Sequence, residues 1–190
     1  MDKFQNKYRI PSTRAPWWDY GTNARYFITI CTKNREHFFG GIENEKMFLS
    51  EIGQMAYDYW MEIPVHFSFI ILDEFTVMPN HIHGIVIINK NDDNVETRQC
   101  LVSTNINTNT ESEKPSPGQK RFRNPGKGTV STVMGSYKSI VTRHAHLIMP
   151  EFGWQSRFHD HIIRDNNEFY RIKNYIANNP KNWKKDKFNR

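Results

Sequence analysis

Cysteine is nearly absent from this sequence: Cys31 and Cys100 are the only two in 190 residues. Two isolated thiols exclude a disulfide framework and a thiolate metal site, so we expect a cytoplasmic protein. The chain also lacks an apolar run long enough to span a membrane, and its first seven residues hold no apolar segment of an export signal. We therefore expect a soluble protein with no membrane partner, folded around the core of a single domain.

Acidic residues are scarce in two short stretches. The chain has 26 Lys and Arg against 20 Asp and Glu, a formal net charge of +6. Residues 119–128 carry four basic residues and no acid, and residues 181–190 carry five basic residues and one acid. Positive charge gathered in this way is typical of a phosphate-binding surface, and solvated basic loops are the alternative.

Hydrophobic periodicity predicts an alternation of strands and helices. Strands are expected over 25–32, 67–75, 81–88 and 153–163, and helices over 46–63, 129–144 and 168–178. The two middle strands are close enough in sequence to pair in antiparallel fashion. Strand, helix, strand, strand is the first half of a ferredoxin-like α+β sandwich, and helix, strand and a final helix complete it.

A long polar insertion divides this pattern. Residues 90–128 are low in complexity, rich in Asn and Thr, and end in a basic cluster. We expect this loop to be partly disordered when free, because such a length is uncommon inside a compact domain. The predicted organisation is an N-terminal arm over 1–23, a domain over 24–183 and a basic tail over 184–190.

The strand over 81–88 opens with two histidines after a Met-Pro-Asn turn. Successive side chains on a strand point to opposite faces, so His81 and His83 share one face. Two imidazoles on one face of a rigid strand form half of a metal site. A pair of surface histidines at a strand end is the alternative.

Two other His-x-His pairs provide a comparison. His144 and His146 lie on a predicted helix, where residues two apart point away from each other and cannot bind one ion. His159 and His161 precede two isoleucines and could lie on a strand. This last pair therefore competes with His81 and His83.

Two polar residues stand out on the last predicted helix. Tyr175 and Asn179 are four residues apart, hence about 40° from each other around the helix. Tyr175 flanks the apolar stripe, so its hydroxyl could reach a site at the sheet surface, and a residue at the edge of the core is the alternative. Tyr137 falls within the apolar stripe of its own helix and is expected in the core.

Taken in order, these motifs resemble the single-tyrosine HUH transposases, and specifically the REP-associated tyrosine transposase group. The resemblance is carried by Pro-Asn-His-Ile-His at 79–83 and Tyr-Ile-Ala-Asn-Asn-Pro at 175–180. It continues through residues 26–32, 34–35, 135–139, 154–155 and 161–164. The insertion sits where relatives are often shorter, and of the third histidine pair only His161 matches the pattern.

The resemblance implies a ferredoxin-like sandwich with a central antiparallel sheet, the HUH nuclease fold, plus a C-terminal helix that carries the nucleophile. It implies a metal-dependent endonuclease and strand transferase that acts on single-stranded or hairpin DNA. His81, His83 and Asn179 match the ligands of a divalent ion, Mg²⁺ or Mn²⁺. Tyr175 matches the nucleophile, which becomes a 5′-phosphotyrosine and leaves a free 3′-hydroxyl. A monomer and a homodimer are both compatible with it.

Basic residues along the chain are the expected DNA contacts: Lys120, Arg121, Arg123, Lys127, Lys138, Arg157 and Arg164. Two alternatives stay open. One is a non-catalytic ferredoxin-like domain that binds nucleic acid through its basic loop and aromatic residues. The other is a replication or plasmid-transfer nickase with the same chemistry.

Overall fold

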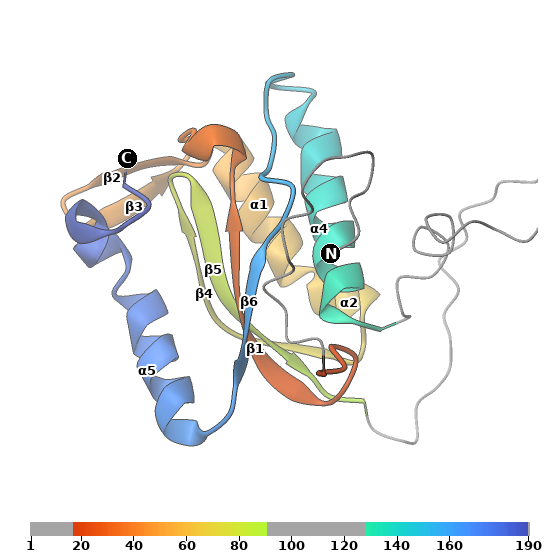
Figure 1. The fold of residues 1–190 in the computed structure, drawn as a ribbon. Helices are drawn as coiled ribbons and strands as arrows, with labels where there is room; N and C mark the ends of the chain where they lie inside the picture. The colour runs from red at the N-terminus through yellow and green to blue at the C-terminus, as the bar shows by residue number, and fades with distance from the viewer. Residues whose placement is uncertain (1–16, 91–127, 190) are drawn as a thin grey trace, which may run out of the picture.

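The computed structural model describes residues 17–90 and 128–189 (Figure 1). Within these ranges a sheet has the strand order β4-β5-β1-β6, and each neighbouring pair is antiparallel. The strands are β1 (Ala24–Cys31), β4 (Ile70–Met78), β5 (His81–Ile88) and β6 (His159–Ile163). This is the ferredoxin-like order, so the predicted fold class is confirmed.

Helices cover the two faces of the sheet differently. On one face lie α1 (Glu51–Met61), the short α2 (Ile63–His66) and α4 (Val130–Ala145). On the other face lie α5 (Asn166–Ala177) and the 3₁₀ helix η2 (Pro180–Lys185) (Figure 1). No helix of the described ranges is long and apolar enough to cross a membrane.

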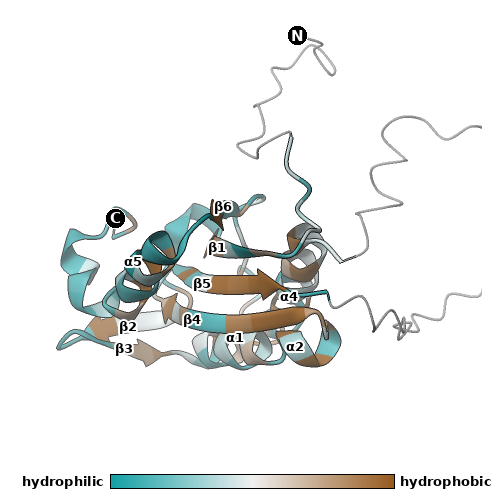
Figure 2. Cartoon of the chain, turned by 90° about the horizontal axis from the view of Figure 1, so that it is seen from below, coloured by the Kyte–Doolittle hydropathy of each residue, from teal (hydrophilic) through white to brown (hydrophobic). Residues whose placement is uncertain are grey.

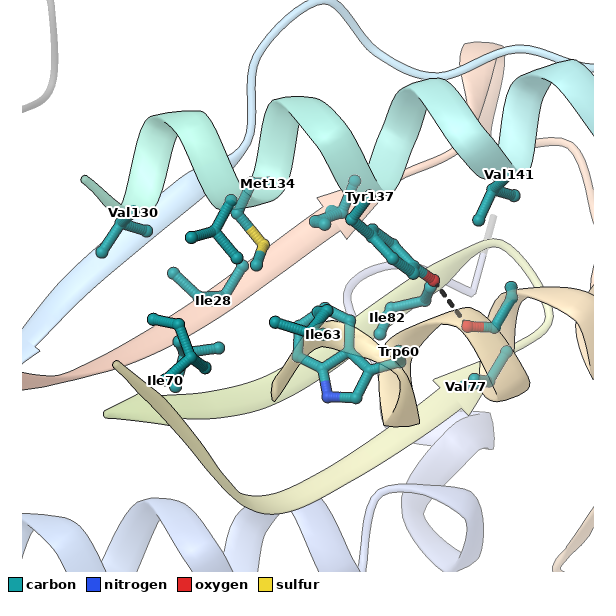
Figure 3. Close-up of a cluster of buried hydrophobic side chains, with 14 of the residues drawn as sticks. Ile28, Trp60, Ile63, Ile70, Val77, Ile82, Val130, Met134, Tyr137 and Val141 are labelled. Atoms are coloured by element: carbon teal, nitrogen blue, oxygen red, sulfur yellow. Dashed lines mark hydrogen bonds between the residues drawn. The ribbon is translucent and has the colours of Figure 1, made fainter. Parts of the chain in front are cut away.

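The main core lies between the sheet and the α1/α4 layer (Figure 3). Alternate residues of β1 and β5 point into it, including Ile28 and Ile82, and Trp60 of α1 packs against them. Tyr137 is buried as predicted, and its hydroxyl donates a hydrogen bond to the carbonyl oxygen of Ala56 (2.8 Å). Gly84 occupies the core face of β5 because a Cβ there would collide with the Trp60 ring. Figure 2 shows the apolar β5 strand beside the mainly hydrophilic α5.

The predicted helix over 46–63 is wrong in its first turn. Lys46–Leu49 is strand β3, which pairs with β2 (Gly40–Glu43) through a tight turn. Asn44 and Glu45 form this turn with φ of 49° and 64°, the left-handed values that a two-residue hairpin requires. The helix begins only after Ser50, whose hydroxyl accepts a hydrogen bond from the amide of Gly53 (3.0 Å).

The insertion leaves and re-enters the described body at one place. The side chain of Lys90 lies within 3.1 Å of where a Cβ at Gly128 would be. Lys90 also donates from Nζ to the carbonyl oxygen of Gly21 (2.6 Å) and exchanges two hydrogen bonds with Asn23. This junction follows the end of β5, whereas His81 begins that strand.

The basic cluster Lys120, Arg121, Arg123 and Lys127 lies outside the described residues, as does most of the predicted N-terminal arm. The domain division therefore stays a prediction.

Candidate active site

His81 and His83 lie side by side on the face of β5 that is turned away from the main core. Their ring centroids are 4.4 Å apart, and the two residues are 0% and 1% exposed. Two backbone hydrogen bonds from distant segments fix the start of the strand: the amide of Thr32 donates to the carbonyl oxygen of Asn80 (2.9 Å) and that of Phe39 to the carbonyl oxygen of Pro79 (3.0 Å). The first histidine pair is therefore a rigid, buried feature and not a surface pair at a strand end.

The side chain of Asn80 determines which nitrogen of His81 is available. Its Nδ2 donates to the carbonyl oxygens of Arg35 (3.2 Å) and Phe188 (2.8 Å). Its Oδ1 must then accept from Nδ1 of His81, 2.8 Å away. The proton is thus on Nδ1, and Nε2 presents a lone pair. Nε2 is buried and has no hydrogen-bond partner within the described ranges.

His83 is held between Thr29 of β1 and Tyr175 of α5. Its Nδ1 lies 2.8 Å from Oγ1 of Thr29, and its Nε2 lies 3.2 Å from the hydroxyl oxygen of Tyr175. Phe27 contacts both rings, with centroids 5.2 Å from His83 and 6.2 Å from Tyr175. The structure therefore brings the predicted nucleophile to the predicted metal ligands.

The start of α5 is fixed by a reciprocal cap. The Asp165 carboxylate accepts from the amide of Glu168 (2.8 Å), and the Glu168 carboxylate accepts from the amide of Arg164 (3.0 Å). Glu168 also pairs with Nε2 of His161 (2.8 Å). This arrangement ties α5 to β6 and so positions Tyr175 three turns later.

Tyr175 and Asn179 both line the site, but they differ in exposure. Tyr175 is 42% exposed, whereas Asn179 is 1% exposed, and neither amide atom of Asn179 has a hydrogen-bond partner of standard geometry among the described residues. The pKa of Tyr175 is raised, first by burial of its hydroxyl and then by the charge of Asp186, while the nearby Asn179 amide opposes the shift.

Asp186 is a candidate ligand that sequence reasoning missed. One ligand atom from each of His81, His83 and Asp186 lies within 4.8 Å of the others. The same segment packs on the histidines: the ring of Phe188 lies 4.5 Å from that of His81, between centroids. The available signal was that Asp186 is the one acid among the basic residues of 181–190.

Both histidines are neutral at neutral pH. Burial lowers the pKa of His81 to about 3, and the charges of Arg35 and Lys187 act in the same direction. Burial also lowers the pKa of His83 well below its usual value, with smaller contributions from His81, Lys187 and His159. Neutral imidazole is the form that binds a metal ion, so the pair can bind an ion without first losing protons.

An open groove of about 1060 Å³ runs from this site across β1 and β6. Its lining combines aromatic rings with cationic side chains, among them Phe27, Phe158, Arg157, Arg171, Lys185 and Lys187. Of the predicted DNA contacts in the described ranges, Arg157 lines this groove. Lys138 instead donates to the carbonyl oxygen of Gln155 (2.7 Å), and Arg164 lies exposed outside the groove lining.

The other two histidine pairs do not form comparable sites. His144 donates to the carbonyl oxygen of Ile140 (3.0 Å) and His146 to that of Phe152 (2.9 Å), so each serves the end of α4 separately. His159 and His161 lie on a strand, β6, and share one of its faces. His161 is paired with Glu168, so the two rings do not form a second site like that of His81 and His83.

No family model matches the chain. An uncharacterized protein of Haemophilus influenzae is 35% identical over 180 residues, which cover 92% of this chain and 90% of that protein. The chain belongs to the family of this protein. The solved structure of a REP-associated tyrosine transposase bound to a REP hairpin matches this chain with a TM-score of 0.56. The match covers 91% of this chain and 74% of the other at 16% identity, so it shows a shared fold.

Proposed function

We propose that the protein is a metal-dependent single-stranded DNA endonuclease and strand transferase of the REP-associated tyrosine transposase group. The observation that carries this proposal is the position of the Tyr175 hydroxyl, 3.2 Å from Nε2 of His83 at the head of a groove lined by cations. A phenol placed beside paired imidazoles provides a nucleophile and a phosphate-activating centre in one site.

The residues fit a divalent metal ion. Nε2 of His81 is buried with an unpaired lone pair within the described ranges, and a carboxylate oxygen of Asp186 lies within 4.8 Å of a ring nitrogen of each histidine. Asn179 adds a buried amide without a standard partner. Mg²⁺ or Mn²⁺ bound here would polarise the scissile phosphate and stabilise charge on its oxygens. The mixed nitrogen and oxygen donors suit Mn²⁺ well, since Mg²⁺ prefers oxygen ligands.

The chain's own side chains orient the substrate. Arg157, Arg171, Lys185 and Lys187 line the groove and would hold successive phosphates of a single strand. Aromatic residues such as Phe158 offer faces on which bases stack. The hydroxyl of Tyr175 attacks phosphorus, forms a 5′-phosphotyrosine and leaves the upstream strand with a 3′-hydroxyl. Tyr175 reaches His83 of its own chain, which favours a tyrosine that acts in its own subunit.

Trapping the covalent adduct tests this function. The protein is incubated with Mn²⁺ and a library of hairpin-bearing single strands labelled at either end, and then resolved on denaturing gels. We expect the 3′ label to stay on the protein and the 5′ label to be released, since the tyrosine bonds to the 5′ end of the downstream strand. Binding without any adduct would instead support a non-catalytic DNA-binding domain.

A further inference from the structure

A row of three side chains crosses the sheet beside Tyr175. Thr29 of β1 is paired with His83 on one side and with His159 of β6 on the other. Directly opposed residues of antiparallel strands point to the same face, so all three side chains point toward the groove, and all three line it. Thr29 is the shortest and is 5% exposed. The Thr29 side chain therefore lies at the bottom of the groove, with an imidazole ring on either side of it.

His159 differs from its neighbours in this row. His83 bonds to Thr29 and Tyr175, and His161 on the same face of β6 pairs with Glu168 at 2.8 Å. His159 makes no side-chain hydrogen bond with any residue that the structure describes and is exposed to the groove. Burial lowers its pKa, His161 and Lys187 act in the same direction, and the adjacent carboxylate of Asp160 opposes them.

The row also fixes which side of a phosphate each group would face. A phosphate above Thr29 has Tyr175 and His83 on its α5 side and His159 on its β6 side. In-line displacement at phosphorus requires the attacking and leaving oxygens on opposite sides. The leaving oxygen therefore faces the imidazole of His159.

We propose that His159 is a catalytic residue that donates a proton to the leaving 3′-oxygen when Tyr175 attacks, and recovers it when the strand is rejoined. This inference rests on the function proposed above. In cleavage, a bond forms between the hydroxyl oxygen of Tyr175 and phosphorus, and the bond from phosphorus to the 3′-oxygen breaks. The electron pair of the broken bond stays on the 3′-oxygen, which takes the proton of the His159 imidazolium. The tyrosine proton passes to solvent water.

Other ionisable groups of the groove are less suited to this task, among them His161, whose ring is paired with Glu168 at 2.8 Å. Arg157 and Arg171 carry guanidinium groups, which bind phosphate and do not act as proton donors in proteins. Asp186 lies with the histidine pair on the nucleophile's side. An imidazole changes charge nearest to neutral pH, which makes it the side chain best matched to giving and taking a proton in one cycle.

A substrate with a better leaving group tests the role of His159. The strand selected from the hairpin library is synthesised twice, with the native 3′-bridging oxygen and with sulfur in its place. A thiolate leaves without a proton donor, so the sulfur substrate does not need His159. We expect His159→Gln to cleave the oxygen substrate on the order of 10²-fold more slowly than wild type, and the sulfur substrate at close to the wild-type rate. The exposed His66 on α2, changed to Gln, should alter neither rate.

The deciding quantity is the ratio of the sulfur rate to the oxygen rate. A ratio in His159→Gln equal to the wild-type ratio overturns the proposal, whether both rates fall together or neither falls. Near-normal cleavage of the sulfur substrate also shows that the variant is folded. If wild-type protein forms no adduct with either substrate, or Tyr175→Phe still forms one, the proposed function fails and this inference with it. A reversed adduct polarity would contradict both the 5′-phosphotyrosine of the proposed function and the assignment of the leaving oxygen.

Discussion

Asn80 sets the protonation pattern of the proposed metal site through a single amide. Its two donated hydrogen bonds leave Oδ1 facing His81, and that contact keeps Nε2 of His81 unprotonated. We expect Asn80→Ala to weaken Mn²⁺ binding by about 10- to 100-fold, the usual cost of losing the partner of a metal-binding histidine. Calorimetric titration measures the loss, and nitrogen chemical shifts of His81 report the tautomer directly. Unchanged affinity in a folded variant would mean that packing alone orients the ring.

Tyr175 and Tyr137 should respond differently to loss of the hydroxyl. Tyr175→Phe keeps the ring against Phe27 and removes the hydroxyl, so it should abolish the adduct while Mn²⁺ affinity is not reduced. Tyr137→Phe should keep the adduct and lose about 1 kcal/mol of stability, because only its bond to the Ala56 carbonyl disappears. Denaturing gels and thermal unfolding read both variants. An adduct that still forms in Tyr175→Phe would show that another residue is the nucleophile.

Asp186 and Asn179 compete for the role of third ligand. A carboxylate offsets the charge of a divalent ion, which a neutral amide does not. We therefore expect Asp186→Asn to weaken Mn²⁺ binding more than Asn179→Ala does, by about tenfold or more, since each 1.4 kcal/mol is a factor of ten. Calorimetry of both variants under identical conditions decides the order. The reverse order would restore the ligand set that the family resemblance implies.

At the scale of elements, the cap of α5 depends on pH. The amide of Arg164 and the ring of His161 both bond to the Glu168 carboxylate and lower its pKa below the usual 4.5. A carboxyl group with a lowered folded-state pKa stabilises the fold above its unfolded pKa, and this stability is lost as the pH falls below it. The stability advantage of wild type over Glu168→Gln should therefore be present at pH 7 and shrink below about pH 4.5. Urea unfolding at pH 7 and below about pH 4.5 measures this difference in stability. An advantage of equal size at both pH values would show that the charge of the carboxylate does not stabilise the cap.

Strands and helices were predicted correctly from the sequence where the hydrophobic periodicity extends over many residues. The strands at 24–31 and 81–88 and the helices at 130–145 and 166–177 all lie within two residues of their expected limits. The β2–β3 hairpin was missed because each strand has only four residues, too few to distinguish a strand from a first helical turn. Its turn gave little signal, since Asn44 and Glu45 reach left-handed φ values without a glycine.

At the scale of the whole molecule, local pattern could not predict contacts between distant segments. The sequence put His81 and His83 on one strand face, and family resemblance drew attention to Tyr175. That Asp186 joins them depends on how η2 folds back over the sheet, which no local pattern encodes. The same holds for His159, which meets the site only through the register of β6 against β1.

The insertion should be separable from the body that carries the site. Because Lys90 and Gly128 lie in contact, replacing residues 91–127 by a short Gly-Ser linker should leave the melting temperature and Mn²⁺ affinity close to wild type. Loss of Lys120, Arg121, Arg123 and Lys127 should weaken binding of single-stranded DNA and shallow its salt dependence by up to about 0.7 for each phosphate contact removed. Filter binding across a salt series tests this. An unchanged salt slope would assign the insertion no part in DNA binding.

The two ends of β5 thus border different parts of the molecule: the histidine pair lies at its start, and the insertion follows its end. Its eight residues separate His81 from the Lys90 junction by about 25 Å. Substitutions, expansions and contractions between residues 91 and 127 start from a point that none of the catalytic candidates touches. Under the proposed function, a lineage could change the DNA it favours through substitutions in that one segment, while the residues proposed for cleavage stay the same.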